Sequence, residues 1–241
     1  HFGYRRQRQM CIRDSVERGT FSHRHAVLKS EDSEEEYLPL NNIDSINKGL
    51  FRIYNSPLSE YGVLGFDYGY ALASPNCLTI WEAQFGDFSN GAQIIIDQYI
   101  SSAEDKWKLQ NGIVLYLPRG DEGQGAEHSS ARMERYLQLC AKDNMYAANC
   151  TTPSNLFHLL RRQMLTKFRK PLILFTPKSL LRHPKVISNI DDLTSSKFIP
   201  VITDSEINPD KVESLVFCSG KFYFDLITVS YTHLRAHETL E

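Results

Sequence analysis

The sequence predicts an α/β fold in which a doubly wound, mostly parallel sheet is followed by a truncated second α/β domain. Short apolar segments typical of buried strands alternate with longer segments that have helical periodicity. Because strands separated by helices of this length form βαβ units, the sheet should be parallel, with helices on both faces. Composition agrees, since 41% of the 241 residues are hydrophobic and 23% are charged, as in ordinary globular proteins.

Four strands and four helices are expected along the main part of the chain. The expected strands are Leu78–Trp81, Gly112–Leu117, Tyr146–Cys150 and Leu172–Thr176. The expected helices are Pro57–Ala73, Ala92–Ser101, Ala131–Ala141 and Pro153–Phe168. Ser56 and Thr152 each place a hydroxyl cap before a proline at the first position of a helix, which favours these two starts.

The segments outside this alternation set the expected domain boundaries. Residues 16–188 form the main domain, and the acidic run Ser30–Glu36 within it is predicted to be a solvated loop. Residues 189–211 are polar and are predicted to be a linker. A strand at Leu215–Cys218 and a helix opened by Gly220 would begin the second domain, at residues 212–228.

The two ends of the chain do not match its middle. Residues 1–15 contain four arginines and no hydrophobic period, and residues 6–15 and 229–240 both resemble translated sequencing-adapter sequence. We therefore expect residues 1–15 and 229–241 to be non-native segments outside the fold. The alternative for the first segment is a disordered basic arm that touches nucleic acid or anionic lipid.

Charge, hydropathy and cysteine content argue against several classes of protein. A net charge of −2 gives no general attraction to nucleic acid, and no apolar run approaches the roughly 18 residues that cross a bilayer. The five cysteines are scattered without a Cys-x-x-Cys pair, which favours reduced thiols in a cytoplasmic setting. His23 and His25 lack nearby cysteine or spaced acidic ligands, so no metal site is expected.

Two segments carry the first candidate functional residues. Glu60 lies in the opening turn of a predicted helix, where the helix dipole alone favours an acidic residue. Phe85 and Phe88 follow a predicted strand, at the carboxyl end where open α/β sheets bind ligands. The two rings suit either ordinary core packing or stacking on a planar ligand.

The segment at 119–132 follows the next strand and contains three glycines, which permit a flexible, closely approaching backbone. A phosphate loop is one interpretation, but Gly-Lys-Ser/Thr is absent and the acidic Asp121, Glu122 and Glu127 would repel phosphate. A catalytic loop that presents His128 beside a helix start is favoured. His183, in the basic segment at 177–184, is expected to be a surface or packing residue.

Together these segments resemble the decarboxylating first component of 2-oxoglutarate dehydrogenase, a thiamin diphosphate enzyme. The resemblance runs from about residue 16 to 226. The stretches that carry it are VERGTFSHRHAVL (16–28), SEYGVLGFDYGYALASP (59–75), WEAQFGDFSNGAQIIIDQYI (81–100), GQGAEHSSARMERYLQL (123–139), LLRRQ (159–163) and PLILFTPKSLLRHP (171–184). It implies a transketolase-like pyrimidine-binding domain and the start of a C-terminal domain, from a longer chain whose amino-terminal domain carries the Gly-Asp-Gly motif and the magnesium ligands.

The resemblance also implies roles for single residues. Glu60 would hydrogen-bond a nitrogen of the cofactor's aminopyrimidine ring and share a proton with it. Phe85 and Phe88 would pack on that ring, and His128 would face the reacting carbon, donating a hydrogen bond or moving a proton. His23 and His25 match a family motif without an assigned role.

The implied reaction is decarboxylation of 2-oxoglutarate, followed by transfer of the succinyl group to a lipoyl group. The implied cofactors are thiamin diphosphate and Mg²⁺. The implied partners are a second copy of the chain, across the cofactor cleft, and a lipoyl-bearing succinyltransferase, with neither nucleic acid nor membrane. Two alternatives stay open: action on pyruvate or 2-oxoadipate, and a non-catalytic oligomerisation module that keeps the fold.

Overall fold

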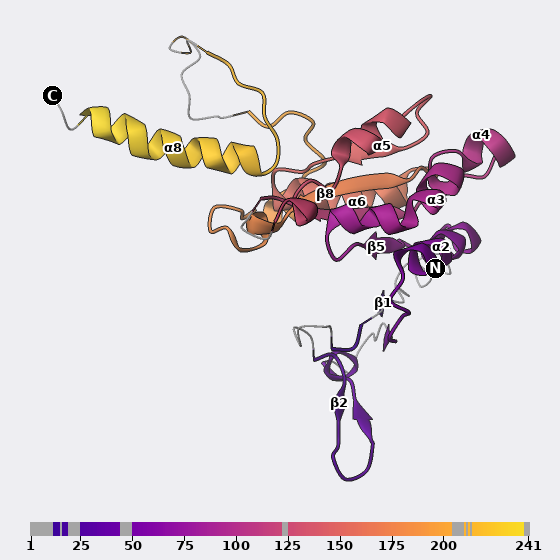
Figure 1. Ribbon diagram of the computed structural model, residues 1–241. Helices are drawn as coiled ribbons and strands as arrows, with labels where there is room; N and C mark the ends of the chain where they lie inside the picture. Colours follow the sequence, from indigo (N-terminus) through magenta and orange to yellow (C-terminus); the bar gives the residue numbers. More distant parts are fainter. Residues whose placement is uncertain are drawn as a thin grey trace. The chain divides into compact units, whose positions relative to one another are not determined.

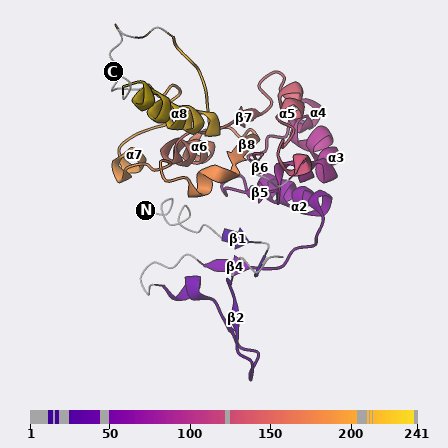
Figure 2. The same ribbon diagram turned by 60° about the vertical axis from the view of Figure 1, so that its left-hand side comes forward.

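The computed structural model describes residues 12–14, 16–18, 25–43, 50–121, 125–203, 210, 212 and 214–238. The chain divides into two compact units, His1–Val63 and Leu64–Glu241. Figure 1 colours both along the sequence, and Figure 2 shows the same elements from a second direction.

The Leu64–Glu241 unit contains a four-stranded parallel sheet in the order β5-β6-β8-β7 (Figure 2). Its strands are β5 (Ile80–Glu82), β6 (Val114–Arg119), β7 (Tyr146–Ala148) and β8 (Leu172–Pro177). Strands β6 and β8 pair along their whole length, from Val114 opposite Leu172 to Arg119 opposite Pro177. All four predicted strands are present within a few residues of their expected bounds, and the predicted α/β class is confirmed.

Both faces of the sheet are covered, because alternate side chains of each strand point to opposite sides. On one face, an apolar core joins strands β6 and β8 to helix α6 (Pro153–Leu165) through Val114, Leu159, Leu172 and Leu174. On the other face, the ring of Phe175 meets Tyr136 of helix α5 (Met133–Leu139), with ring centroids 5.9 Å apart. The arrangement is therefore doubly wound, as predicted.

The remaining helical segments of this unit are short, apart from the first and the last. They are α2 (Glu60–Ala73, which begins in the preceding unit), η2 (Gly86–Ala92), α3 (Gln93–Ile95), the π-helical η3 (Ile96–Ile100), α4 (Ala103–Trp107), η4 (Ala126–His128), η5 (Lys178–Arg182), α7 (Ile190–Thr194) and α8 (Lys221–Glu238). None of the helices in the described part of the chain is long and apolar enough to cross a membrane.

One of the two predicted helix caps is confirmed and the other is wrong. Thr152 Oγ1 accepts a hydrogen bond from the Asn155 backbone nitrogen at 3.3 Å and caps α6. At α2 the cap is Ser59, whose Oγ accepts from the Gly62 nitrogen at 3.2 Å. The expected start after Ser56 fails because the Ser59 nitrogen bonds the Pro57 carbonyl at 3.0 Å, which makes a tight turn before the helix.

Three other expectations need correction. The continuous helix expected at 92–101 is divided between α3 and η3. The helix expected from Ala131 begins at Met133, because Ala131 and Arg132 have left-handed φ values of 53° and 50°. Leu215–Cys218 is exposed and irregular rather than a strand, and no described strand lies beside it to satisfy its backbone groups. The helix after Gly220 is present as α8.

The described residues of the His1–Val63 unit include two small pairs of strands. Strand β1 (Ile12–Asp14) pairs in parallel with β4 (Phe51–Ile53), and β2 (Leu28–Lys29) forms a hairpin with β3 (Glu36–Tyr37). The turn η1 (Pro39–Asn42) follows the hairpin. The acidic run at 30–36 is exposed in this hairpin, as predicted. The domain boundaries and the non-native assignment of both ends stay predictions, and residues 1–11 and 239–241 lie outside the described residues.

Candidate functional site

Three loops of the Leu64–Glu241 unit leave the carboxyl ends of three strands that are neighbours in the sheet. Phe85 and Phe88 follow β5, His128 follows β6, and Lys178 follows β8. Because β5, β6 and β8 are parallel and adjacent, these loops share one edge of the sheet. Open α/β sheets bind their ligands at this edge.

Phe85, Phe88 and His128 form what we call the aromatic cluster. The rings of Phe85 and His128 stack with centroids 4.3 Å apart and an interplanar angle of 8°. Phe88 meets the imidazole edge-on at 5.2 Å and the ring of Phe85 at 5.8 Å. All three residues are half-buried, so a planar ligand can reach rings whose positions the protein already fixes.

The imidazole of His128 combines this packing with free hydrogen-bonding capacity. Its Nδ1 is buried and has no hydrogen-bond partner among the residues described. Its Nε2 lies 3.8 Å from Oε1 of Glu127, a carboxylate whose side chain is largely exposed. A buried ring nitrogen without a protein partner is costly unless water or a ligand satisfies it, which makes this side chain a candidate for proton transfer.

Two residues that sequence reasoning left without a role hold the loop of His128 against the loop of Phe85. Asp87 is buried, and its Oδ2 accepts a hydrogen bond from the Ala131 nitrogen at 2.8 Å. Gly86 permits the close approach, since a Cβ there would lie 2.4 Å from the Cβ of Ala131. The only signal in the sequence was an acidic residue between two aromatic ones directly after a strand.

Lys178 was also missed, because the segment at 177–184 was interpreted only as basic. Its Nζ donates a hydrogen bond to the His128 carbonyl at 3.2 Å and lies 4.9 Å from the centre of the Phe85 ring. Its position immediately after a predicted central strand was the available signal. His183, in the same segment, packs against Phe224 with centroids 5.3 Å apart, as expected of a packing residue.

Glu60 is the first residue of α2 and is half-buried, in the His1–Val63 unit. The aromatic cluster belongs to the other unit, so the approach of Glu60 to it stays a prediction. His25 is exposed, whereas His23, Glu122 and Gly123 lie outside the described residues. Among the residues that the structure describes, no three His, Cys, Asp or Glu side chains gather in a metal-binding group.

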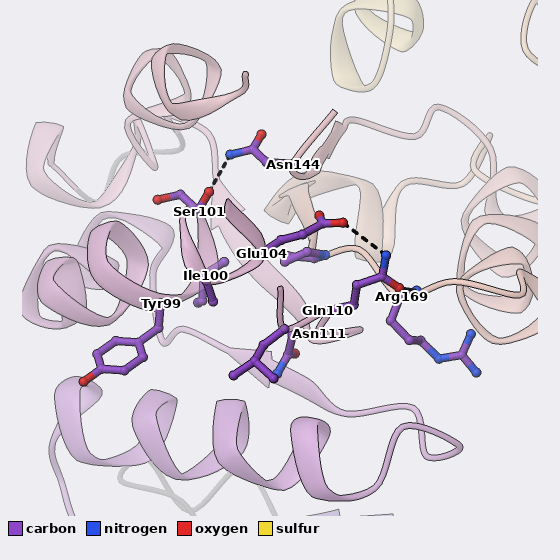
Figure 3. A pocket seen from close by; sticks show the side chains of 11 residues that line it. Tyr99, Ile100, Ser101, Glu104, Gln110, Asn111, Asn144 and Arg169 are labelled. Atoms are coloured by element: carbon purple, nitrogen blue, oxygen red, sulfur yellow. Dashed lines mark hydrogen bonds between the residues drawn. The ribbon is translucent and has the colours of Figure 1, made fainter. Parts of the chain in front are cut away.

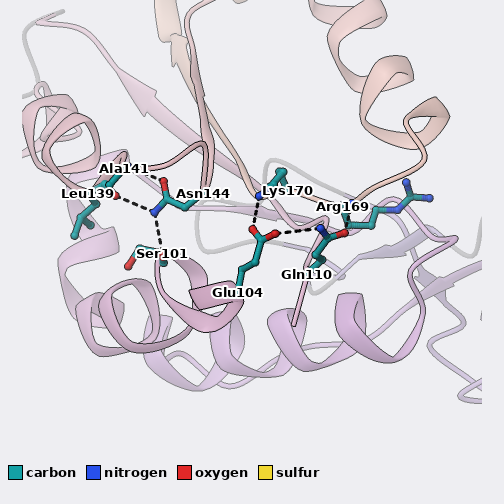
Figure 4. A network of polar contacts seen from close by, with 8 residues as sticks. All are labelled: Ser101, Glu104, Gln110, Leu139, Ala141, Asn144, Arg169 and Lys170. Carbon is teal, nitrogen blue, oxygen red and sulfur yellow. Dashed lines mark hydrogen bonds and ion pairs between the residues drawn. The ribbon is translucent and has the colours of Figure 1, made fainter. Parts of the chain in front are cut away.

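A second polar region lies around α4, where a small pocket is lined by residues that include Tyr99, Glu104 and Arg169 (Figure 3). Glu104 accepts hydrogen bonds from Lys170 and, at 3.1 Å, from Gln110 (Figure 4). The hydrogen bond from Lys170 holds the pKa of the Glu104 carboxyl below its ordinary value. Glu104, Lys170 and Gln110 thus pair their charges and hydrogen-bonding groups with one another. We therefore interpret this region as a link between elements of the fold and not as a candidate site.

Comparison with known families agrees with this geometry. A model of the transketolase pyrimidine-binding domain matches residues 3–184 of the chain. The chain belongs to this family. A second model, described as 2-oxoglutarate dehydrogenase C-terminal, matches residues 187–239, directly after the pyrimidine-binding domain.

Three curated relatives of the chain share one name. Proteins called "2-oxoglutarate dehydrogenase E1 component" from Brucella ovis, Brucella canis and Brucella abortus are 54% identical to the chain over 222 residues. Each alignment covers 88% of this chain and 22% of the relative. The chain thus spans about a fifth of the length of these relatives, and the resemblance stated from its motifs is confirmed.

Proposed function

We propose that this chain contributes the pyrimidine-binding part of the active site of a 2-oxoglutarate dehydrogenase E1 component. The observation that carries the proposal is the aromatic cluster, which joins the two phenylalanines and the histidine named from the sequence at the carboxyl edge of the sheet. The 54% identity to proteins of that name supports the choice of enzyme.

The residues present fit the aminopyrimidine end of thiamin diphosphate. The ring is planar and bears nitrogen donors and acceptors, so it suits half-buried aromatic faces beside a buried imidazole nitrogen that has no partner among the described residues. We place the Mg²⁺ ligands in the part of the relatives that this chain does not match. When bound, thiamin diphosphate supplies the carbon nucleophile and accepts the electron pair released by decarboxylation.

Each residue of the proposed site has a distinct task. The carboxyl group of Glu60 shares a proton with a nitrogen of the aminopyrimidine ring and so fixes its tautomer. Phe85 and Phe88 orient that ring and exclude water from its faces. His128 donates a hydrogen bond, or moves a proton, at the substrate carbonyl.

The proposed substrate is 2-oxoglutarate, and the proposed acceptor is the lipoyl group of a succinyltransferase. We further propose a homodimer with the cofactor in the cleft between subunits, and a cytoplasmic location without nucleic-acid or membrane partners. The four described cysteines form no disulfide with one another, in keeping with a reducing compartment. A panel of pyruvate, 2-oxoglutarate and 2-oxoadipate, tested on a full-length relative, decides among the related substrates.

The test of the proposed site is Glu60→Gln, made at the matching position of a full-length 2-oxoglutarate dehydrogenase E1 component. Glutamine keeps the size of the side chain but cannot share the proton, so decarboxylation should fall by about 10²-fold or more. Glu31→Gln, which alters an exposed carboxyl in the hairpin, serves as the matched control. Near-normal decarboxylation by the Glu60 variant contradicts the proposal.

A further inference from the structure

We propose that Lys178 is a positioning residue that holds His128 and Phe85 in their stacked arrangement. The inference rests on the proposed function, since it concerns the histidine assigned to proton transfer there. Lys178 is half-buried and is the first residue of η5, directly after β8. From this position its side chain reaches the loops that follow both β5 and β6.

The contacts of Lys178 join the ring of Phe85 to the backbone of His128 through one ammonium group. Its Nζ donates to the His128 backbone carbonyl at 3.2 Å and lies 4.9 Å from the centre of the Phe85 ring. A cation over an aromatic face is attracted by the ring's quadrupole, and a charged donor strengthens the hydrogen bond to the carbonyl. Displacement of the Phe85 ring, or of the His128 backbone that carries the imidazole, would therefore break one of the two contacts and disturb the 4.3 Å stack.

The local backbone shows why such a contact is needed. His128 ends a three-residue turn, η4, which begins beside Gly125 at a φ of 92°. Two hydrogen bonds anchor the loop. The Gly120 nitrogen donates to the Ser129 carbonyl at 2.9 Å, and the Ala131 nitrogen donates to the Asp87 carboxylate. These anchors fix the ends of the loop and do not act on the ring of Phe85, whereas Lys178 contacts both that ring and the backbone of His128 itself.

The experiment uses nuclear magnetic resonance of the 241-residue chain labelled with ¹³C-histidine, in the absence of cofactor and substrate. Stacking on Phe85 displaces the ring protons of His128 upfield, and the loss of one signal in His128→Gln assigns them. Lys178→Met keeps the length of the side chain but removes the charge and the donor. The His128 ring protons should then move downfield, and the cross-relaxation between the Phe85 and His128 rings should weaken.

Lys178→Arg retains both a cation and a donor, and should restore the upfield position and the cross-relaxation. Lys167→Met removes an exposed lysine elsewhere in the same unit and should change neither. If circular dichroism shows that Lys178→Met does not fold, Lys178→Gln replaces it; this variant lacks the cation over Phe85 and should also move the His128 protons downfield.

The proposal is overturned if the folded Met or Gln variant keeps the upfield shifts and the cross-relaxation of the unaltered chain. Failure of the arginine variant to restore them also overturns it. Because the readout needs no cofactor, this failure is distinct from failure of the proposed function, which the decarboxylation assay of Glu60→Gln reports.

Discussion

At the scale of single residues, Gly86 carries a steric requirement that local sequence does not reveal. A Cβ at this position would lie 2.4 Å from the Ala131 Cβ and 2.9 Å from the Leu117 Cβ, both parts of a packed layer. We expect Gly86→Ala to lower the free energy of unfolding by about 1–3 kcal/mol, because overpacking forces the loop and the strand apart. Denaturant unfolding followed by circular dichroism measures the change.

Gly69→Ala is the matched control, since a Cβ there meets no atom within 4 Å and Gly69 lies inside α2. Alanine should stabilise that helix by about 0.5–1 kcal/mol relative to glycine. If both substitutions change the free energy of unfolding in the same direction, the steric account of Gly86 is wrong.

Tyr136 makes a second prediction at this scale. Burial raises the pKa of its phenol to about 12, and its hydroxyl donates to Ser89 Oγ at 2.8 Å. A raised pKa in the folded state means that the stabilisation is complete below the ordinary value of 10 and is lost as pH rises from 10 towards 12. We expect Tyr136→Phe to lower the free energy of unfolding by about 1 kcal/mol near neutral pH, because the hydrogen bond to Ser89 is lost.

The same variant should lose less stability than the unaltered chain between pH 10 and 12, a window set by the ordinary and raised pKa values of Tyr136. Urea unfolding at several alkaline pH values measures this slope. Burial also raises the pKa of Tyr116 to about 12, so Tyr116 contributes to the loss of stability in the same pH window. The free energy of unfolding of the double variant, with Phe at both positions, should therefore depend still less on pH there. If neither substitution changes the slope of the free energy of unfolding against pH, these two tyrosines are not the source of the alkaline loss of stability.

At the scale of elements, the ion pair of Glu104 and Lys170 ties α4 to the segment before β8 (Figure 4). The hydrogen bond from Lys170 lowers the pKa of Glu104 from its ordinary value of 4.5. A lowered pKa in the folded state means that the stabilisation is present above 4.5 and is lost as pH falls below that value. We expect Glu104→Gln to lower the free energy of unfolding at pH 7 by about 1 kcal/mol, since the pair is partly exposed.

The difference between Glu104→Gln and the unaltered chain should shrink as the pH falls from 5 towards 3, around the ordinary pKa of 4.5. Unfolding midpoints measured across this range provide the test. Glu31→Gln, at an exposed position in the hairpin, should show no comparable convergence. A constant difference between Glu104→Gln and the unaltered chain would show that charge is not the source of the stabilisation.

At the scale of the whole molecule, the 241-residue chain should bind thiamin diphosphate weakly. The described residues offer one aromatic cluster and a few hydrogen bonds, each worth about 0.5–1.5 kcal/mol. Association itself costs at least about 4 kcal/mol, so a Kd in the millimolar range or weaker is expected. Calorimetric titration with thiamin diphosphate and Mg²⁺ measures it, and micromolar binding or turnover of 2-oxoglutarate by this chain contradicts the prediction.

The sequence by itself predicted the elements whose signals are local. Apolar runs located the four strands of the sheet, and the cap at Thr152 located the start of α6, because burial and capping act over a few residues. The six motif stretches between residues 16 and 184 together also sufficed to name the family. Where local signals compete, as at Ser56 and Ser59, the predicted start of the helix was wrong.

Only the tertiary structure decided which loops meet. Asp87 bonds the backbone of Ala131, 44 residues away, and Lys178 bonds that of His128, 50 residues away. These contacts depend on the strand order β5-β6-β8-β7, which places β8 beside β6 although β7 comes between them in the chain. Strand order is set by the packing of whole layers rather than by local propensity, and for that reason the roles of Gly86, Asp87 and Lys178 emerged only from the structure.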